Sequence, residues 1–114
     1  MIPPGARILL RAAAVDFRRG AEGLVALVRE AGADPFDGSV YVFRAKRADS
    51  IKVVWWDGSG LCLFAKRLER SHFCWPAVGS REIRLSYAQA TALVEGLDWK
   101  RVRAVDVRAP QSAG

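Results

Sequence analysis

The sequence predicts a small single domain of the α+β class, a mainly antiparallel meander of about five short strands with two helices packed on it. Three features predict this class. Apolar residues recur at helical spacing over 17–31 and again over 87–97, and between these stretches β-branched and aromatic runs alternate with polar turns. The third feature is composition: of 114 residues, 51% are hydrophobic and 26% are charged, which is typical of a globular domain with its own core.

The N-terminal part of the chain is expected to form a strand and then a helix. A run of small, basic and apolar residues at 6–11 predicts the strand. The helix is predicted by an apolar stripe at intervals of three and four, made of Phe17, Gly20, Leu24, Leu27, Val28 and Ala31. Asp16 is the expected N-cap and Gly32 the expected end, although two early glycines move the expected start toward Ala21. The composition of 33–38 predicts a turn.

The middle of the chain is expected to form three strands, at 40–43, 50–56 and 61–68. The last two are joined by a tight hairpin turn at 57–60, because its Asp-Gly pair provides the positive φ values that such turns need. Apolar residues occur at both alternating positions of these strands. Both faces of the sheet are therefore expected to be covered.

Two further strands and a second helix are expected toward the C-terminus. The strands are predicted at 72–75 and 82–85. Ser86 and Gln89 have the spacing of a capping box, in which each side chain bonds to a backbone N–H of the other. The helix that follows is expected to end near Gly96.

We expect one domain over 1–99 and a partly disordered tail over 100–114. No apolar stretch approaches the roughly 20 residues of a membrane span, and the N-terminus lacks the features of a secretion signal, so a cytoplasmic location is expected. Cys62 and Cys74 have apolar neighbours, and we interpret both as reduced core residues without a disulfide.

The supply of catalytic side chains is small. His72 is the only histidine, and on the predicted strand it shares a face with Cys74, so the spacing is compatible with a Cys/His nucleophile. The simpler interpretation is a half-buried histidine beside a core thiol. One histidine and two distant cysteines also fall short of the four ligands of a structural zinc site. We therefore predict no catalytic residue, no metal site and no cofactor.

The acidic residues are scattered along the chain. A metal-dependent nuclease needs carboxylates that converge on metal ions, and nothing in the spacing brings them together. Asp57 is explained by its turn and Glu69 by solvent exposure beside basic neighbours. The glycines at 58 and 60 do not form a phosphate-binding loop, because no Lys-Ser or Lys-Thr pair follows them.

Basic charge is the feature that points to a function. The chain has 18 Lys and Arg against 12 Asp and Glu, a net charge of +6 and a pI near 10.0. Pairing of 50–56 with 61–68 brings basic residues to the end of the ladder opposite the turn, which predicts phosphate contacts. The predicted DNA-binding residues are Arg44, Lys46, Arg47, Lys52, Lys66, Arg67 and Arg70. Trp55 and Trp56 either stack on bases or belong to the core.

The stretch 51–69, followed by Phe73, Trp75 and Pro76, resembles the TnpB-type accessory protein, the second reading-frame product of the insertion sequence sixty-six family of bacterial transposons. The resemblance continues at 16–20, 23–24, 42–44 and 93–99. One departure lies at Cys74, where relatives often have an ordinary apolar residue, and this weakens a thiol mechanism further.

The resemblance implies a small non-catalytic protein that is encoded beside a separate transposase and supports transposition. The implied partners are transposon DNA and the cognate transposase, with no membrane and no small-molecule substrate. A DNA-bound protein of this kind is expected at the nucleoid. Two alternatives remain open: a module that binds an acidic partner protein without contacting DNA, and a metal-dependent nuclease.

Overall fold

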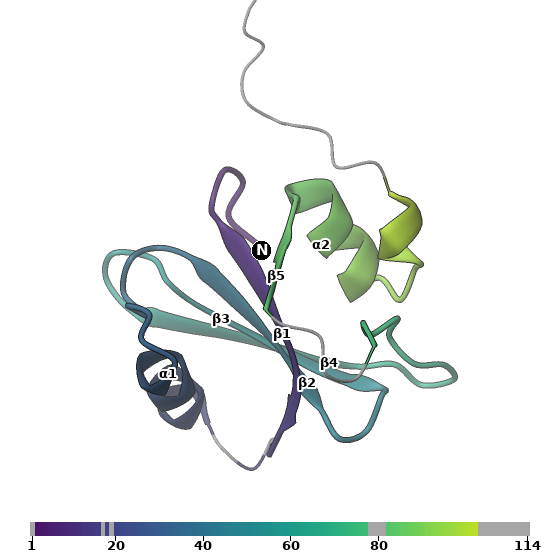
Figure 1. Ribbon diagram of the computed structural model, residues 1–114, viewed down its shortest axis with the longest axis horizontal. Coiled ribbons are helices and arrows are strands. Elements are labelled where there is room, and N and C mark those ends of the chain that lie inside the picture. Colours follow the sequence, from purple (N-terminus) through teal and green to yellow (C-terminus); the bar gives the residue numbers. More distant parts are fainter. Residues whose placement is uncertain (1, 17, 19, 78–81, 103–114) are drawn as a thin grey trace, which may run out of the picture.

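A computed structural model describes residues 2–16, 18, 20–77 and 82–102 and shows one five-stranded sheet with helices on either side (Figure 1). The strands lie in the order β4-β3-β2-β1-β5. The α+β class is confirmed, with two helices and a mostly antiparallel sheet. The elements are β1 (Ile8–Val15), α1 (Ala21–Glu30), β2 (Val40–Ala45), β3 (Ser50–Trp56), β4 (Leu61–Arg67), β5 (Ile83–Leu85), α2 (Tyr87–Val94) and the 3₁₀ turn η1 (Trp99–Arg101).

One strand pair differs from the predicted meander. β1 and β2 run parallel, with Ile8 beside Val40 and Val15 beside Ala45, while the other three pairings are antiparallel. A parallel pair needs a crossover connection, and α1 supplies it. As a consequence, β1 and β2 end at the same end of the sheet.

The boundaries of α1 agree with the predicted start near Ala21 and end at Gly32, but the predicted N-cap is wrong. β1 continues in extended backbone as far as Val15, so the N-cap is Gly20 and not Asp16. The Asp16 carboxylate accepts the backbone N–H of Arg18 instead. Gly32 has a φ of +86°, the left-handed conformation in which helices commonly end.

Both faces of the sheet are covered, as predicted. On one face α1 buries Leu24, Val25 and Val28 against Tyr41, Phe43 and Val54. On the other face α2 packs over a larger core that includes Ile8, Leu10, Val42, Ile51, Val53, Phe73 and Trp99. Figure 1 shows the two helices on opposite sides of the sheet. Removal of this apolar surface from water is the main favourable contribution to folding.

The predictions that depended on local signals are confirmed at two places. β3 and β4 form a hairpin around 57–60, in which Asp57 Oδ1 accepts the N–H groups of Ser59 and Gly60. Because these backbone bonds favour the carboxylate, the pKa of Asp57 lies below its ordinary value. At α2, Ser86 and Gln89 form the reciprocal capping box with bonds of 2.9 and 3.0 Å.

The predicted strand at 72–75 is absent, and this segment pairs with no strand. It crosses the β2–β3 turn, where the backbone N–H of Phe73 and the Nε1–H of Trp75 both donate to the carbonyl oxygen of Ala48, at 2.9 and 3.0 Å. Phe73 then fills the core below α2. Burial of the Phe73 ring, and not strand pairing, therefore fixes this segment on the domain. His72 is exposed, whereas the sequence predicted a half-buried histidine.

The described chain continues past the predicted domain end. Trp99 is buried, its indole N–H donates to the carbonyl of Cys74, and it begins η1, which extends to Arg101. The remainder of the predicted tail, 103–114, lies outside the described residues. No described helix has the length and apolar character required to cross a membrane.

Candidate nucleic-acid interface

The end of the sheet opposite the β3–β4 hairpin collects five of the seven predicted DNA-binding residues. Lys46 and Arg47 lie in the β2–β3 turn, and Lys52 follows on β3. The register brings β4 alongside, because Ser50 pairs with Arg67 and Ile51 with Lys66. We call Lys46, Arg47, Lys52, Lys66 and Arg67 the sheet-end basic surface.

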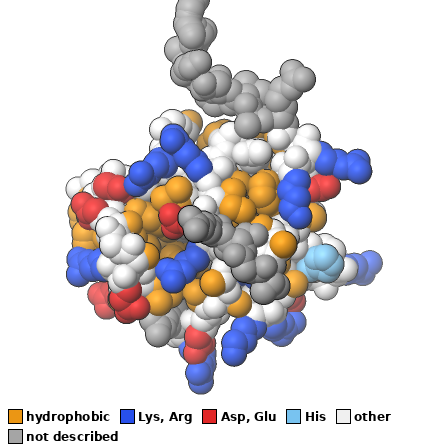
Figure 2. All heavy atoms as spheres, in the orientation of Figure 1, with side chains coloured by type: hydrophobic (Ala, Val, Ile, Leu, Met, Phe, Trp, Pro, Cys, Tyr) orange, Lys and Arg blue, Asp and Glu red, His pale blue; other side chains and the backbone are white. Residues whose placement is uncertain are grey.

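Two open hollows adjoin each other on this surface and share Ser50. The first has a volume of about 480 Å³ and is lined by Val15, Asp16, Arg18, Ala45, Lys46, Arg47 and Ser50. The second, of about 280 Å³, is lined by Ser50, Ile51, Lys52, Ala65, Lys66 and Arg67. Lys and Arg side chains gather along the lower border of Figure 2, below the ends of β1 and β2. Small aliphatic side chains lie between long cationic ones.

Some of these cations already have acidic neighbours. Arg47 contacts Asp49 at 2.9 Å, Arg18 contacts Asp16 at 2.7 Å, and Lys66 lies 4.0 Å from Glu95. Each pair has at least one exposed side chain, and such pairs contribute little free energy, so an anion can displace them at small cost. In the part of the chain that the structure describes, no ion pair joins Lys46 or Arg67 to an acid.

The Arg47–Asp49 pair also changes the pKa of Asp49. Burial by itself raises the pKa of Asp49, but hydrogen bonds from Arg47 and Ser50 and the charge of Arg47 outweigh it, and the pKa lies below its ordinary value. Asp49 is therefore a carboxylate at neutral pH. Its negative charge lies 2.9 Å from the guanidinium of Arg47.

Arg44 lies on the same face of the sheet as Ile51 and Lys66, because β2, β3 and β4 pair these three positions side by side. Its guanidinium carbon is 5.4 Å from the centre of the Trp75 ring, and its Nε is buried without a hydrogen-bond partner among the described residues. Arg70 is exposed in the loop after β4 and lines neither hollow. Neither residue belongs to the sheet-end basic surface.

Arg18 lines the first hollow, and sequence reasoning missed it. Its neighbourhood depends on the parallel pairing of β1 with β2, which brings the end of β1 beside the β2–β3 turn. The only available signal was the basic pair at 18–19 in the stretch that carries the family resemblance.

The two tryptophans considered for base stacking lie toward the hairpin end of β3. Trp55 packs against the larger core. Trp56 meets Phe36 edge to face, with ring centres 5.3 Å apart, and the guanidinium of Arg29 lies over Phe36 at 5.0 Å. Each ring therefore has a partner within the domain, at a distance from the sheet-end basic surface.

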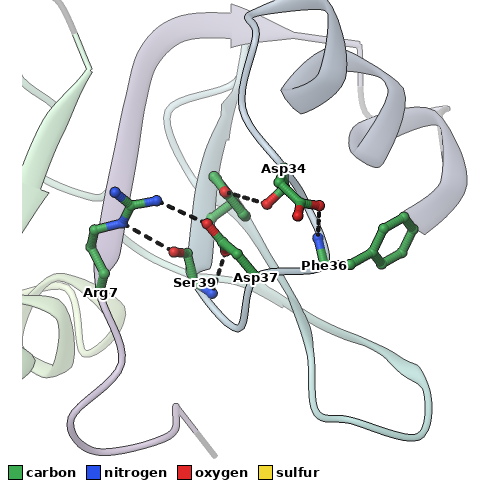
Figure 3. Close-up of polar contacts among 6 residues, drawn as sticks. Arg7, Asp34, Phe36, Asp37 and Ser39 are labelled. Carbon is green, nitrogen blue, oxygen red and sulfur yellow. Dashed lines mark hydrogen bonds and ion pairs between the residues drawn. The ribbon is translucent and has the colours of Figure 1, made fainter.

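A second polar cluster holds the loop between α1 and β2 against the start of β1 (Figure 3). Arg7 donates to Asp37 at 3.0 Å and to the hydroxyl of Ser39 at 3.1 Å, and Asp37 also accepts the N–H of Ser39. Burial by itself raises the pKa of Asp37. Hydrogen bonds from Ser39 and the charge of Arg7 lower it by more, so the pKa lies below its ordinary value. The hydroxyl of Tyr41 donates to the carbonyl of Asp34. This arrangement positions the loop.

Within the described residues, no hydrogen bond joins His72 to either cysteine. His72 contacts only the carbonyl of Phe73 among the bonds seen for it, at 3.2 Å, and both cysteines are free. Burial, together with the nearby carboxylate of Asp57, raises the pKa of Cys62, which disfavours the reactive thiolate. Over the described ranges, no three His, Cys, Asp or Glu side chains lie close enough to hold a metal ion.

The fold and the charge define a small basic domain of the α+β class. The particular family follows from comparison: the chain belongs to the family described as IS66 Orf2 like protein, which matches residues 6–104. The resemblance inferred from the sequence is thereby confirmed.

Two curated relatives cover nearly the whole chain. Uncharacterized protein y4jC of Sinorhizobium fredii (strain NBRC 101917 / NGR234) is 47% identical over 113 residues, which is 96% of this chain and 97% of the relative. Uncharacterized protein y4hO of the same strain is 39% identical over 103 residues, 88% of this chain and 90% of the relative. No solved structure matches the chain significantly.

Proposed function

We propose that this chain is a non-catalytic accessory protein of IS66-type transposition that binds transposon DNA through the sheet-end basic surface. One observation carries the proposal: five basic side chains from β3, β4 and the β2–β3 turn border two adjoining hollows. Family membership supports the transposition context. Phosphate is the ligand that flexible cations on an open surface favour.

The dimensions of the surface agree with contact to a nucleic-acid backbone. Three neighbouring strands span about 10 Å between β2 and β4, and Lys and Arg side chains extend this reach on both sides. DNA presents one phosphate charge per about 1.7 Å of helix axis, so several phosphates fall within that span. Contacts to phosphate position a protein without reading sequence, and we therefore expect weak dependence of affinity on sequence.

The test is fluorescence anisotropy with labelled duplex from the ends of the element, at about 50 and 200 mM salt. The wild-type chain is expected to bind, and its affinity is expected to fall steeply between these salt concentrations. The Lys46→Gln/Arg67→Gln variant is expected to bind at least tenfold more weakly. The control, Arg84→Gln/Lys100→Gln, removes the same charge from exposed positions on β5 and η1 and is expected to bind nearly as wild type.

Two outcomes contradict the proposal. One is affinity that is absent or independent of salt. The other is equal weakening in both double variants, because that shows an effect of net charge and not of this surface. The transposase is the alternative partner: copurification that survives nuclease treatment and is lost only in the Lys46→Gln/Arg67→Gln variant assigns the surface to an acidic protein.

A further inference from the structure

β4 is an open edge of the sheet within the described part of the chain. The strand order ends at β4 on one side and at β5 on the other. β5 is only three residues long, whereas β4 has seven residues that pair with β3 without a bulge. Sheet edges are usually protected by shortness, proline, bulges or charge. Between Leu61 and Ala65, β4 has none of these devices.

The hydrogen bonds at the two ends of the hairpin show which backbone groups point outward. The N–H of Asp57 donates to the carbonyl of Gly60 at 3.1 Å, and the N–H of Leu68 donates to the carbonyl of Asp49 at 2.9 Å. Both belong to hydrogen-bonded pairs of the same antiparallel ladder. Because such pairs alternate with non-hydrogen-bonded ones, the outward N–H and C=O groups belong to Leu61, Leu63, Ala65 and Arg67.

We propose that the β4 edges of two copies of this chain pair antiparallel about a two-fold axis at Phe64. In this register Leu63 of one copy lies opposite Ala65 of the other, and Arg67 lies opposite Leu61. All four outward residues of each copy then exchange backbone hydrogen bonds. The two sheets join into one continuous sheet, with α2 of both copies on the same face.

Side chains on both faces fit this pairing. Leu63 is 42% exposed in the single chain, and Ala65 of the second copy covers it. On the other face, the half-buried Phe64 meets its own symmetry mate. Cross-strand aromatic pairs of this kind stabilise antiparallel sheets.

Charge favours a second copy of the chain as the occupant. The register sets Lys66 of one copy opposite Cys62 of the other, and the thiol of Cys62 lies 3.5 Å from Asp57 Oδ2. The ammonium group of Lys66 therefore reaches the Asp57 carboxylate of the other copy, and symmetry provides this ion pair twice. Parallel pairing instead sets the Lys66 and Arg67 side chains of the two copies side by side, which is unfavourable.

The first test is the mass of the chain by sedimentation equilibrium over rising concentration. Wild type is expected to approach twice its 12.5 kDa. Ala65→Pro is expected to stay monomeric yet folded, because the Ala65 N–H points away from β3 and an edge strand tolerates proline. Ala65→Val keeps the N–H and is the control that is expected to dimerise. Leu63→Lys is a second blocking variant without proline.

The second test reads out the register by cross-linking in a Cys74→Ser background. Oxidised Lys66→Cys is expected to form a covalent dimer with Cys62 of the other copy, because the paired Cα atoms are about 4.5 Å apart. Within one chain the two positions are roughly 13 Å apart, too far for a disulfide. Adding Cys62→Ser is expected to abolish the cross-link.

The proposal fails if wild type remains monomeric, if Ala65→Pro and Leu63→Lys dimerise like wild type, or if the cross-link forms without Cys62. A monomeric wild type that binds the transposase, when Ala65→Pro does not, also overturns it and assigns the edge to another protein. None of these outcomes depends on DNA binding, because mass and cross-linking are measured without nucleic acid.

Discussion

The guanidinium of Arg44 lies over the ring of Trp75, with 5.4 Å between Cζ and the ring centre. Arg44 is part of β2, and Trp75 belongs to the segment that crosses the β2–β3 turn and donates to Ala48. The contact therefore ties this segment to the sheet. It also engages the guanidinium of one of the predicted phosphate ligands within the domain.

Arg44→Ala is expected to destabilise the fold and to leave DNA affinity unchanged. Loss of the cation–π contact and of the packed side-chain stem is expected to lower the free energy of unfolding by about 1–2 kcal/mol. Arg67→Ala is expected to do the reverse, with stability within about 0.5 kcal/mol of wild type and weaker binding. Urea unfolding and DNA titration of both variants measure this. Weaker DNA binding by a stable Arg44→Ala chain would refute the assignment.

Each single variant, Lys46→Gln and Arg67→Gln, is expected to lose one phosphate contact. The affinity for DNA should therefore depend less steeply on salt concentration. Each contact contributes about 0.9 to the slope of log K against log salt concentration, so each variant is expected to lose roughly that amount. Titrations at four or more salt concentrations give the slope. Arg84→Gln is the matched control on β5, and its slope is expected to equal that of wild type.

Asp37 makes stability depend on pH in the acidic range. Burial raises its pKa, but hydrogen bonds from Ser39 and the charge of Arg7 outweigh burial, and the net pKa is below the ordinary value of 3.8. A lowered pKa stabilises the fold above about pH 4, and this stabilisation is lost as pH falls through the folded-state pKa.

We therefore expect Asp37→Asn to lower the free energy of unfolding by about 1 kcal/mol near pH 6, with the difference from wild type shrinking below pH 4. Urea unfolding at a series of pH values measures both. Arg7→Gln is the control, because it removes the cation but keeps the carboxylate. In this variant the free energy of unfolding is expected to change less with pH than in wild type. A difference that persists unchanged at pH 2.5 contradicts this account.

Gly96→Ala is expected to destabilise the end of α2. Gly96 has a φ of +80°, which side chains with a Cβ rarely adopt, and an added Cβ would lie 3.1 Å from Leu68 Cδ1. The expected loss is about 1 kcal/mol or more. Gly60→Ala is the control, since open space surrounds that position at ordinary φ. Equal thermal midpoints for the two variants would show that neither constraint operates.

Much of the fold was predictable because its signals are local. The Ser86–Gln89 capping box, the Asp-Gly turn and the glycine that ends α1 each depend on residues within a few positions of one another. The strand at 72–75 was mispredicted for the opposite reason. Its composition resembles that of a strand, but distant contacts to Ala48 and the core decide its conformation.

The sequence by itself determined the order of the two helices and of the five strands that form, the basic charge and its concentration between β2 and the end of β4, because composition and short-range patterns carry that information. The tertiary structure alone decided that β1 and β2 pair in parallel, which adds Arg18 to the first hollow. It also decided that Arg44 faces Trp75 and that β4 has an open edge. The physical reason is that strand neighbours and sheet faces are set by contacts between segments far apart in the chain.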